Sequence, residues 1–507
     1  MAYLARIEWE MLQNPVTFEC EIPEQLPTGN QAKCNVYRDD EYKIAADLEI
    51  TGVDHRDVEY RREQRRKVPA GTNVTTWTLS SVNHSVYRYS LSGAVEGSST
   101  LNFNPTTSAT IYKAQLLITA GFDMQVDTDY ELGWISDWYI NGPRNAFLFT
   151  SSSRRKYKET FEREFSSLDG LGIPQIFKGS CEFSGSMYDH SLIQSGDVTF
   201  IIGRVPKSYG PSWSNNLFIS YFPQLGPIPQ VETREAISEI VGFILGRHLL
   251  HVGSSTFDQL GQQMQQNAIS PWGDNIKATC LRPDLSPIHK GQHDELNLVD
   301  DTLRSLTAEY LRLRDSFSLR DALWRYWIAN GTPLGTNLPI LSSALECLMK
   351  AWFRSTKSKS HGVYVPYKEF QELIAEGVEK IDQALSDVSA REIILRKIAG
   401  TNQMGVNEQF TVFFEEIGLP IGDVEQVAIR ERNSMAHGHL TGDDWHYVAV
   451  VTRAYQTLFH RVFLKLLRYS GQYVDYSTYG FPKRDLLEPM GGPLGDGQLK
   501  KELVRRA

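Results

Sequence analysis

An arginine and a histidine near the C-terminal end of the chain could together act on a phosphate group. The segment reads Ile429-Arg430-Glu431-Arg432-Asn433-Ser434-Met435-Ala436-His437-Gly438. A guanidinium is a planar set of donors that stays protonated, so it can stabilise negative charge growing on a phosphate. An imidazole takes up and releases a proton near neutral pH, as general acid–base catalysis requires. Arg432 and His437 therefore provide groups that could cleave a phosphodiester without a metal ion.

An arginine followed closely by a histidine is a weak signal by itself, because the chain contains three other such pairs. These pairs each have six residues between the two members: Arg282 and His289, Arg354 and His361, Arg453 and His460. The first contains prolines that forbid a regular helix, the second lies in a Lys/Ser-rich stretch, and the third lies inside a long helical pattern. The Arg432 segment differs because it also has an Asn beside the Arg, a small residue before the His and a Gly after it.

The run from Arg432 to Gly438 resembles the signature of the HEPN superfamily, helical domains of which many are metal-independent ribonucleases. The resemblance covers about residues 320 to 470. A β-rich region followed by such a bundle also resembles the ApeA-like abortive-infection proteins of bacterial phage defence. The resemblance implies that Arg432, Asn433 and His437 are catalytic, with Arg430 and His439 in support. The family usually carries an acidic residue on an earlier helix that faces the motif arginine, and Glu346 is the candidate here.

The expected activity is endoribonuclease cleavage by attack of the RNA 2′-hydroxyl, which leaves a 2′,3′-cyclic phosphate and needs no cofactor or metal. One motif supplies one main histidine, whereas efficient cleavage uses a base and an acid. A homodimer joined through the C-terminal bundle would bring two copies of His437 to one RNA cleft. A nuclease of this kind must stay silent until triggered, so we expect the N-terminal domain to restrain it and to receive a phage-derived trigger or a regulatory ligand.

Other readings of the same residues stay open. Arg432 and His437 could simply complete the end of a helix, with Gly438 as its cap, in a bundle that dimerises or binds RNA or a partner without catalysis. His439, Asp443, Asp444 and His446 could join His437 in a metal site, although the two aspartates also suit the first turn of a helix, and we expect no metal. A third possibility is a β-domain that recognises carbohydrate or protein, with the helices as scaffold.

The pattern of apolar residues predicts an α+β protein of several domains. From about Pro15 to Gln224 apolar residues alternate, as in Ile44, Ala46, Leu48 and Ile50, which predicts an antiparallel β-rich domain of sandwich or barrel type. A charged run near residue 61 and a short helix around Tyr157 to Phe165 are expected to interrupt it. The prolines after Phe222 break both periodicities and mark a boundary.

Helical periodicity dominates the remainder of the chain. Helices are expected from about Asp423 to Met435 and from about Asp443 to Tyr469, so that the Arg432 segment spans their junction. The expected division is a β-rich sensor domain at 1–225, a helical connecting region at 226–320, an all-α HEPN-like bundle at 321–470 and an extended tail at 471–507.

Composition is that of an ordinary globular protein, with 41% hydrophobic and 22% charged residues and a net charge of −9. This acidic balance gives no basic surface over a whole domain, so RNA would be held by a local patch or by two chains together. The five cysteines form no Cys-x-x-Cys pair, which argues against a disulfide framework or zinc knuckle. The N-terminal residues lack the apolar run of a signal peptide or membrane span, so we expect a cytoplasmic protein with no membrane partner.

Overall fold

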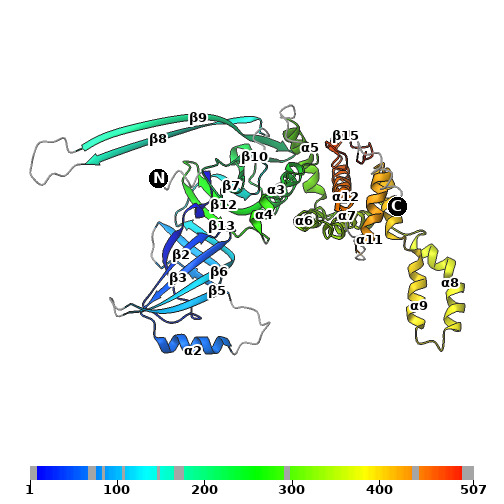
Figure 1. Ribbon diagram of the computed structural model, residues 1–507, viewed down its shortest axis with the longest axis horizontal. Coiled ribbons are helices and arrows are strands. Elements are labelled where there is room, and N and C mark those ends of the chain that lie inside the picture. The colour runs from blue at the N-terminus through cyan, green and yellow to red at the C-terminus, as the bar shows by residue number, and fades with distance from the viewer. Residues whose placement is uncertain are drawn as a thin grey trace, which may run out of the picture. The chain divides into compact units, whose positions relative to one another are not determined.

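The structure, a computed structural model, describes residues 8–66, 76–82, 86–104, 109–144, 149–164, 176–273, 275–289, 297–436 and 445–493. They belong to two compact units (Figure 1). The first is built from the described parts of Met1–Pro229, Leu249–Pro283 and Gly291–Asp300, and the second from those of Gln230–His248, Asp284–Lys290 and Asp301–Ala507. Among the described helices, none has the length and apolar character needed to cross a membrane.

The first unit is organised around one large antiparallel sheet. Its strands in the described residues are β1 (Val16–Cys20), β2 (Gln31–Arg38), β3 (Ile44–Thr51), β4 (Trp77–Ser80), β5 (Tyr87–Asn104), β6 (Ala109–Val126), β7 (Leu132–Ile140), β8 (Ser151–Glu164), β9 (Ile176–Ser195), β10 (Val198–Arg204), β11 (Leu217–Tyr221), β12 (Leu250–Asp258) and β13 (Gln263–Ala268). The short helices η1 (Met11–Gln13), α2 (His55–Arg66), η3 (Pro223–Leu225) and α4 (Ile276–Cys280) also belong to this unit.

The long strand β6 organises this sheet. One edge of β6 pairs with β5 from end to end, while its other edge pairs first with β3 and then, after residue 117, with β13. The strands β1, β2, β3, β6, β5 and β4 follow one another, and a bridge between Cys20 and Ser81 links the end of β1 back to the residue after β4. Alternate residues of these strands, including Leu48, Leu116 and Phe122, form one buried core.

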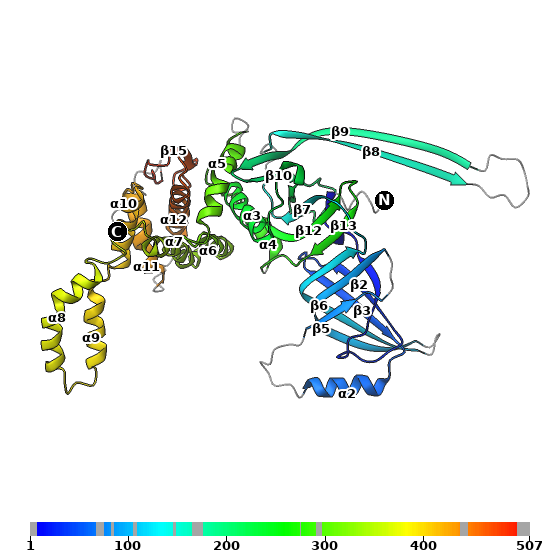
Figure 2. The same cartoon turned by 180° about the vertical axis from the view of Figure 1, so that it is seen from behind.

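The region expected to be a helical connection, residues 226–320, is not wholly helical. It contains β12 and β13, which join the sheet between β6 and β7 (Figure 2). Leu250, Val252 and Phe257 of β12 are buried, but the phase of burial changes at the register shift between His251 and Gly253, so no single period-two pattern runs through the sequence of this strand. The domain boundary is therefore crossed more than once, because Gln230–His248 and Asp284–Lys290 belong to the second unit.

The short helix expected around Tyr157 to Phe165 is also wrong. These residues up to Glu164 belong to β8, whose backbone pairs in continuous register with β9 from Ser152 to Glu164. The charged run near residue 61, by contrast, lies in the helix α2. In residues 157–164, cross-strand pairing with β9 outweighs the local preference for a helix, since strand formation depends strongly on the neighbouring strands.

The second unit is a helical bundle. Its helices in the described residues are α3 (Val231–Leu245), α5 (Leu298–Leu313, which begins at the boundary between the units), α6 (Leu319–Gly331), α7 (Asn337–Arg354), α8 (Tyr367–Ala384), α9 (Arg391–Ala399), α10 (Val406–Ile417), α11 (Asp423–Ala436) and α12 (Trp445–Leu466), with a short turn η5 (Gly400–Asn402). Helix α12 has 16 of its 22 residues buried, so it is surrounded by other elements rather than buried on one face. Helix α7 packs against α6, α10, α11 and α12.

The segment after α12 does not form the extended tail that was expected for residues 471–507. Within its described part, β14 (Gln472–Val474) and β15 (Lys483–Asp485) form an antiparallel pair. Tyr473, Val474 and Leu486 are buried against the bundle of the same unit. Residues 494–507 lie outside the described residues. The α+β class with a β-rich N-terminal region and a largely helical C-terminal region is confirmed.

Candidate active site

Helix α11 carries the first part of the candidate catalytic motif at its C-terminal end. The helix runs to Ala436, so the backbone of Arg432 and Asn433 is helical, close to the predicted extent. The side chains of Arg432 and Asn433 lie outside the described residues, as do His437, Gly438 and His439 in full. The next helix, α12, begins at Trp445. The motif therefore begins in the last turns of α11, and His437 follows the end of that helix.

Glu346 lies on α7, the helix that packs against both α11 and α12. Its side chain is 24% exposed and accepts hydrogen bonds from Ser342 Oγ and Lys350 Nζ, each at 3.2 Å. The bundle thus brings the helix with the candidate acidic residue next to the helix with the motif arginine. Arg430, the other supporting residue, is exposed on α11, with its Nε 3.4 Å from the carbonyl oxygen of Gln426.

The opposite end of α11 is held by a buried ion pair that was not anticipated from the sequence. Glu425 in the first turn of α11 pairs with Arg461 of α12, and both side chains are fully buried. The backbone N–H groups of Gly422 and Met490 donate to Glu425 at 3.0 and 2.8 Å. Burial raises the pKa of Glu425, and the charge of Arg461 opposes that shift. No local sequence signal marks this pair, because its members are far apart in the chain.

Arg461 also connects α12 to the C-terminal segment. Its Nη2 donates to the carbonyl oxygens of Pro420 and Leu486 at 2.9 and 3.0 Å, and its guanidinium lies 5.1 Å from the centre of the Tyr473 ring. Hydrogen bonds to two carbonyl oxygens and a carboxylate compensate for removing the charge from water. The N-terminal end of α11, α12 and residues 471–490 are therefore fixed to one another around Arg461.

Two histidines from the other Arg–His pairs of the sequence, His460 and His289, are buried and poorly suited to acid–base catalysis. His460 of α12 is fully buried, its Nε2 lies 2.6 Å from the hydroxyl of Tyr326, and burial lowers its pKa to about 3. Burial likewise lowers the pKa of His289 to about 4. Groups with such pKa values stay neutral near pH 7, so they cannot deliver a proton there.

The described residues contain no group of three His, Cys, Asp or Glu side chains that could hold a metal ion. Of the alternative metal cluster, His437, His439, Asp443 and Asp444 lie outside the described residues. His446 is described, and it is exposed in the first turn of α12. Cys20 and Cys34 are free and buried in the first unit, as expected for structural thiols, and burial raises the pKa of Cys20 to about 12.

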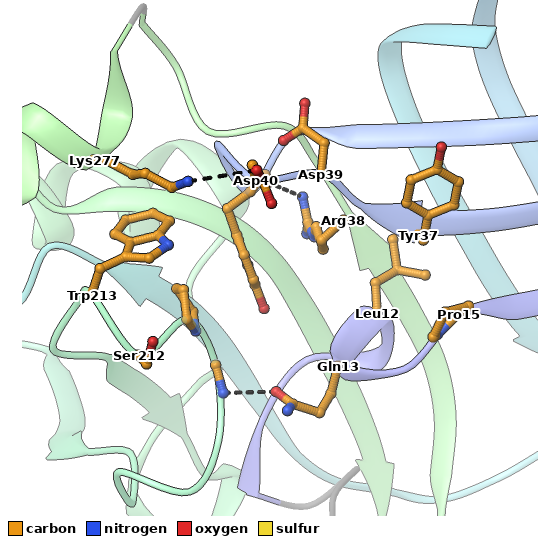
Figure 3. A pocket seen from close by; sticks show the side chains of 13 residues that line it. Leu12, Gln13, Pro15, Tyr37, Arg38, Asp39, Asp40, Ser212, Trp213 and Lys277 are labelled. Atoms are coloured by element: carbon orange, nitrogen blue, oxygen red, sulfur yellow. Dashed lines mark hydrogen bonds and ion pairs between the residues drawn. The ribbon is translucent and has the colours of Figure 1, made fainter. Parts of the chain in front are cut away.

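A separate pocket of about 380 Å³ lies in the first unit (Figure 3). Its wall includes Tyr37 and Arg38 at the end of β2, Trp213 from a loop, and Lys277 of α4. The Arg38 side chain is only 4% exposed, and its Nε, Nη1 and Nη2 all bond protein atoms: Glu10, and the carbonyl oxygens of Tyr42, Ile269 and Val252. Arg38 therefore fixes the wall at the end of β2 to β12 and to the residues before η1 and after β13.

The polar groups at the mouth of this pocket are also partly paired with each other. Lys277 Nζ lies 4.0 Å from Asp40 Oδ2, and Asp39 Oδ1 accepts hydrogen bonds from the backbone N–H groups of Glu41 and Lys43. The pocket is polar, and these contacts do not define one ligand class. Neither protein-family models, nor curated proteins, nor solved structures gave any match to this chain.

Proposed function

We propose that this protein is a metal-independent endoribonuclease of a bacterial anti-phage abortive-infection system, with Arg432, Asn433 and His437 as catalytic residues. The observation that carries the proposal is the packing of α7, which bears Glu346, against α11, which ends in the motif. This is the helix neighbourhood that the resemblance to HEPN ribonucleases implies. The buried pair of Glu425 and Arg461 gives α11 a fixed end from which the motif can be positioned.

In the proposed reaction, one His437 imidazole removes the proton of the RNA 2′-hydroxyl as that oxygen attacks the adjacent phosphorus. The bond from phosphorus to the 5′-oxygen breaks, and a second imidazole protonates the leaving oxygen. Arg432 stabilises the charge on the phosphate oxygens in the transition state, and Asn433 orients the imidazole or the RNA backbone. The products are a 2′,3′-cyclic phosphate and a 5′-hydroxyl end.

The second imidazole comes from another copy of the chain in this proposal. A two-fold dimer through the C-terminal bundle would place both copies of His437 in one cleft. The β-rich first unit would restrain this site until a phage-derived trigger or a regulatory ligand binds. The pocket beside Trp213 and Lys277 is a candidate place for such a ligand.

The test is to change Arg432 and His437 separately to alanine and to measure RNA cleavage and growth arrest when the full chain is expressed. We expect each change to reduce cleavage at least a hundredfold, because each removes a group that acts in the transition state. Matched controls are His446→Ala, an exposed histidine in the first turn of α12, and Arg304→Ala, whose side chain is 44% exposed on α5. Both controls should retain wild-type activity.

Cleavage should also persist in a chelator, and the RNA fragments should carry cyclic phosphate ends. If the Arg432 and His437 variants fold, dimerise and still cleave RNA at the wild-type rate, the catalytic assignment is wrong. If the wild-type chain binds RNA or dimerises but neither cleaves RNA nor arrests growth, the bundle is a non-catalytic dimerisation or binding module instead.

A further inference from the structure

The helices α8 and α9 form a hairpin with an unusually open surface. The two helices pack on each other (Figure 1), yet neither buries a single residue, although the structure describes both in full. Phe370, Ile374 and Ile394 are half-buried, as expected for apolar residues on the sides where the two helices meet. A helical pair that buries so little apolar surface gains little stability from its own packing, since helices are stabilised mainly by burying an apolar face.

A second apolar stripe of the hairpin is exposed. On α8 it consists of Leu373, Gly377 and Ile381, with Leu373 69% and Ile381 38% exposed. On α9 it contains Ile393, which is 50% exposed. A Cβ atom added to Gly377 would meet nothing within 4 Å, so the middle of this stripe is open to a closely packed neighbour.

Both exposed stripes border the same face of the hairpin. By helical spacing, Leu373 lies about a third of a turn from the half-buried residues of α8, and Ile393 lies further round, by about two fifths of a turn, from those of α9, in the same rotational sense. In an antiparallel pair of helices, that shared sense directs both stripes to one side. The exposed apolar residues Leu373 and Ile381 of α8 and Ile393 of α9 therefore border one side of the hairpin.

Charges divide this surface into an acidic helix and a basic helix. Helix α8 has five acidic and two basic side chains, a net charge of −3, and α9 has three basic and one acidic, a net charge of +2. On α8, Glu369 and Glu376 lie beside the exposed stripe by helical spacing, together with Lys380, which pairs with Glu376 at 2.5 Å. On α9, Arg396 and Lys397 lie beside Ile393. The surface therefore carries both halves of a complementary pattern.

We propose that the hairpin of one chain packs face to face with the hairpin of a second copy. A surface that is acidic on one half and basic on the other is complementary to itself under a two-fold rotation, as an isologous interface requires. With the two-fold axis parallel to the helices, α8 of each copy lies antiparallel on α9 of its partner. The product is an antiparallel four-helix bundle that covers Leu373, Ile381 and Ile393, a common way for two helical hairpins to associate.

This self-association concerns a surface outside the Arg432 motif and goes beyond the proposed ribonuclease. It can be tested with two charge variants of the full chain. The first carries Glu369→Lys and Glu376→Lys on α8, and the second carries Arg396→Glu and Lys397→Glu on α9. Asp382 and Arg391 stay unchanged, because their ion pair, with Arg391 Nη2 2.7 Å from Asp382 Oδ2, holds the two helices together near the turn.

Sedimentation equilibrium should show that each charge variant alone self-associates at least tenfold more weakly than the wild-type chain. An equimolar mixture of the two should regain wild-type association, because a hairpin with a net positive charge then faces one with a net negative charge. Leu373→Glu should weaken association in the same way without restoration by either variant. The matched control is Glu59→Lys with Glu63→Lys, two exposed glutamates of α2, which should leave association unchanged.

The proposal is wrong if the charge variants associate like the wild-type chain, or if mixing them restores nothing. A wild-type chain that stays monomeric would also overturn it, and another protein or an RNA would then be the partner of the hairpin. The ribonuclease proposal fails separately. The Arg432→Ala variant should lose RNA cleavage and keep the hairpin association. A charge variant of the hairpin that associates more weakly should still lose cleavage when Arg432 is changed, so each test bears on one proposal only.

Discussion

At the scale of single residues, the pair of Glu425 and Arg461 is the main unexpected finding. Both side chains are fully buried, and the pair joins α11, α12 and the segment around Met490. Removing one partner of such a pair leaves an uncompensated charge away from water. The stability of the bundle should therefore depend on both partners being present.

We expect Glu425→Gln to lower the free energy of unfolding of the helical unit by about 3–5 kcal/mol, the usual effect of breaking a buried pair. Chemical denaturation followed by circular dichroism measures this change. The control is Lys380→Ala, which breaks the exposed pair with Glu376 and should change stability by less than about 1 kcal/mol. A loss of similar size in both variants would show that burial does not strengthen the effect.

At the scale of elements, β12 shows how the sheet accommodates a segment returning from the helical unit. Its pairing with β7 shifts in register between His251 and Gly253, which is a β-bulge. Gly253 has φ +155°, and a Cβ atom there would lie 2.3 Å from the carbonyl oxygen of Asn267 on β13. The bulge thus requires a residue without a side chain where β13 approaches closely.

Gly253→Ala should destabilise the β-rich unit by about 1–3 kcal/mol, because the alanine combines backbone strain with a close contact to backbone atoms. Thermal unfolding of the full chain, followed by tryptophan fluorescence, reports the change. Gly331→Ala is the matched control. Its added Cβ meets nothing within 4 Å at the end of α6, so it should be neutral or slightly stabilising. Equal effects of the two changes would rule out a special role for the bulge.

At the scale of the whole molecule, the two units differ in how they should respond to acid. His289 and His460 are both buried, and both belong to the helical unit. Their pKa values in the folded chain are lowered to about 4 and about 3, below the value of about 6.5 expected for an unfolded chain. Between these values the unfolded chain binds protons that the folded helical unit does not.

The helical unit should consequently lose stability as the pH falls from about 6.5 toward 4, by up to about 1.4 kcal/mol per pH unit for each histidine. The stability is fully present above pH 6.5 and decreases in this window, because protonation favours the unfolded state. Hydrogen exchange at pH 7 and pH 5, corrected for intrinsic rates, should show a larger loss of protection in α12 than in β6. A His460→Phe variant should show a smaller acid effect than the wild-type chain. Equal acid sensitivity of the two units would contradict this expectation.

Much of the fold followed from local patterns in the sequence. Alternation at Ile44, Ala46, Leu48 and Ile50 predicted a strand, and β3 covers these residues. Helical spacing placed α11 within a residue of its observed end, because a long amphipathic stripe is a strong local signal. The position of Arg432 and Asn433 in the last turns of a helix was likewise determined by sequence alone.

Tertiary structure decided what local patterns cannot encode. The strands β12 and β13 join the sheet through β7 and β6, which are distant in the chain, and β8 is held by its hairpin partner β9. Pairing with another strand leaves little trace in one window of sequence. The burial of His460 and Arg461 on α12 could not be predicted from the sequence either, because their partners, Tyr326 and Glu425, come from other helices. The motif from Arg432 to His437 was found from residue types and spacing in the sequence. The packing of α7, the helix of Glu346, against α11, the helix in which that motif begins, is a property of the folded chain.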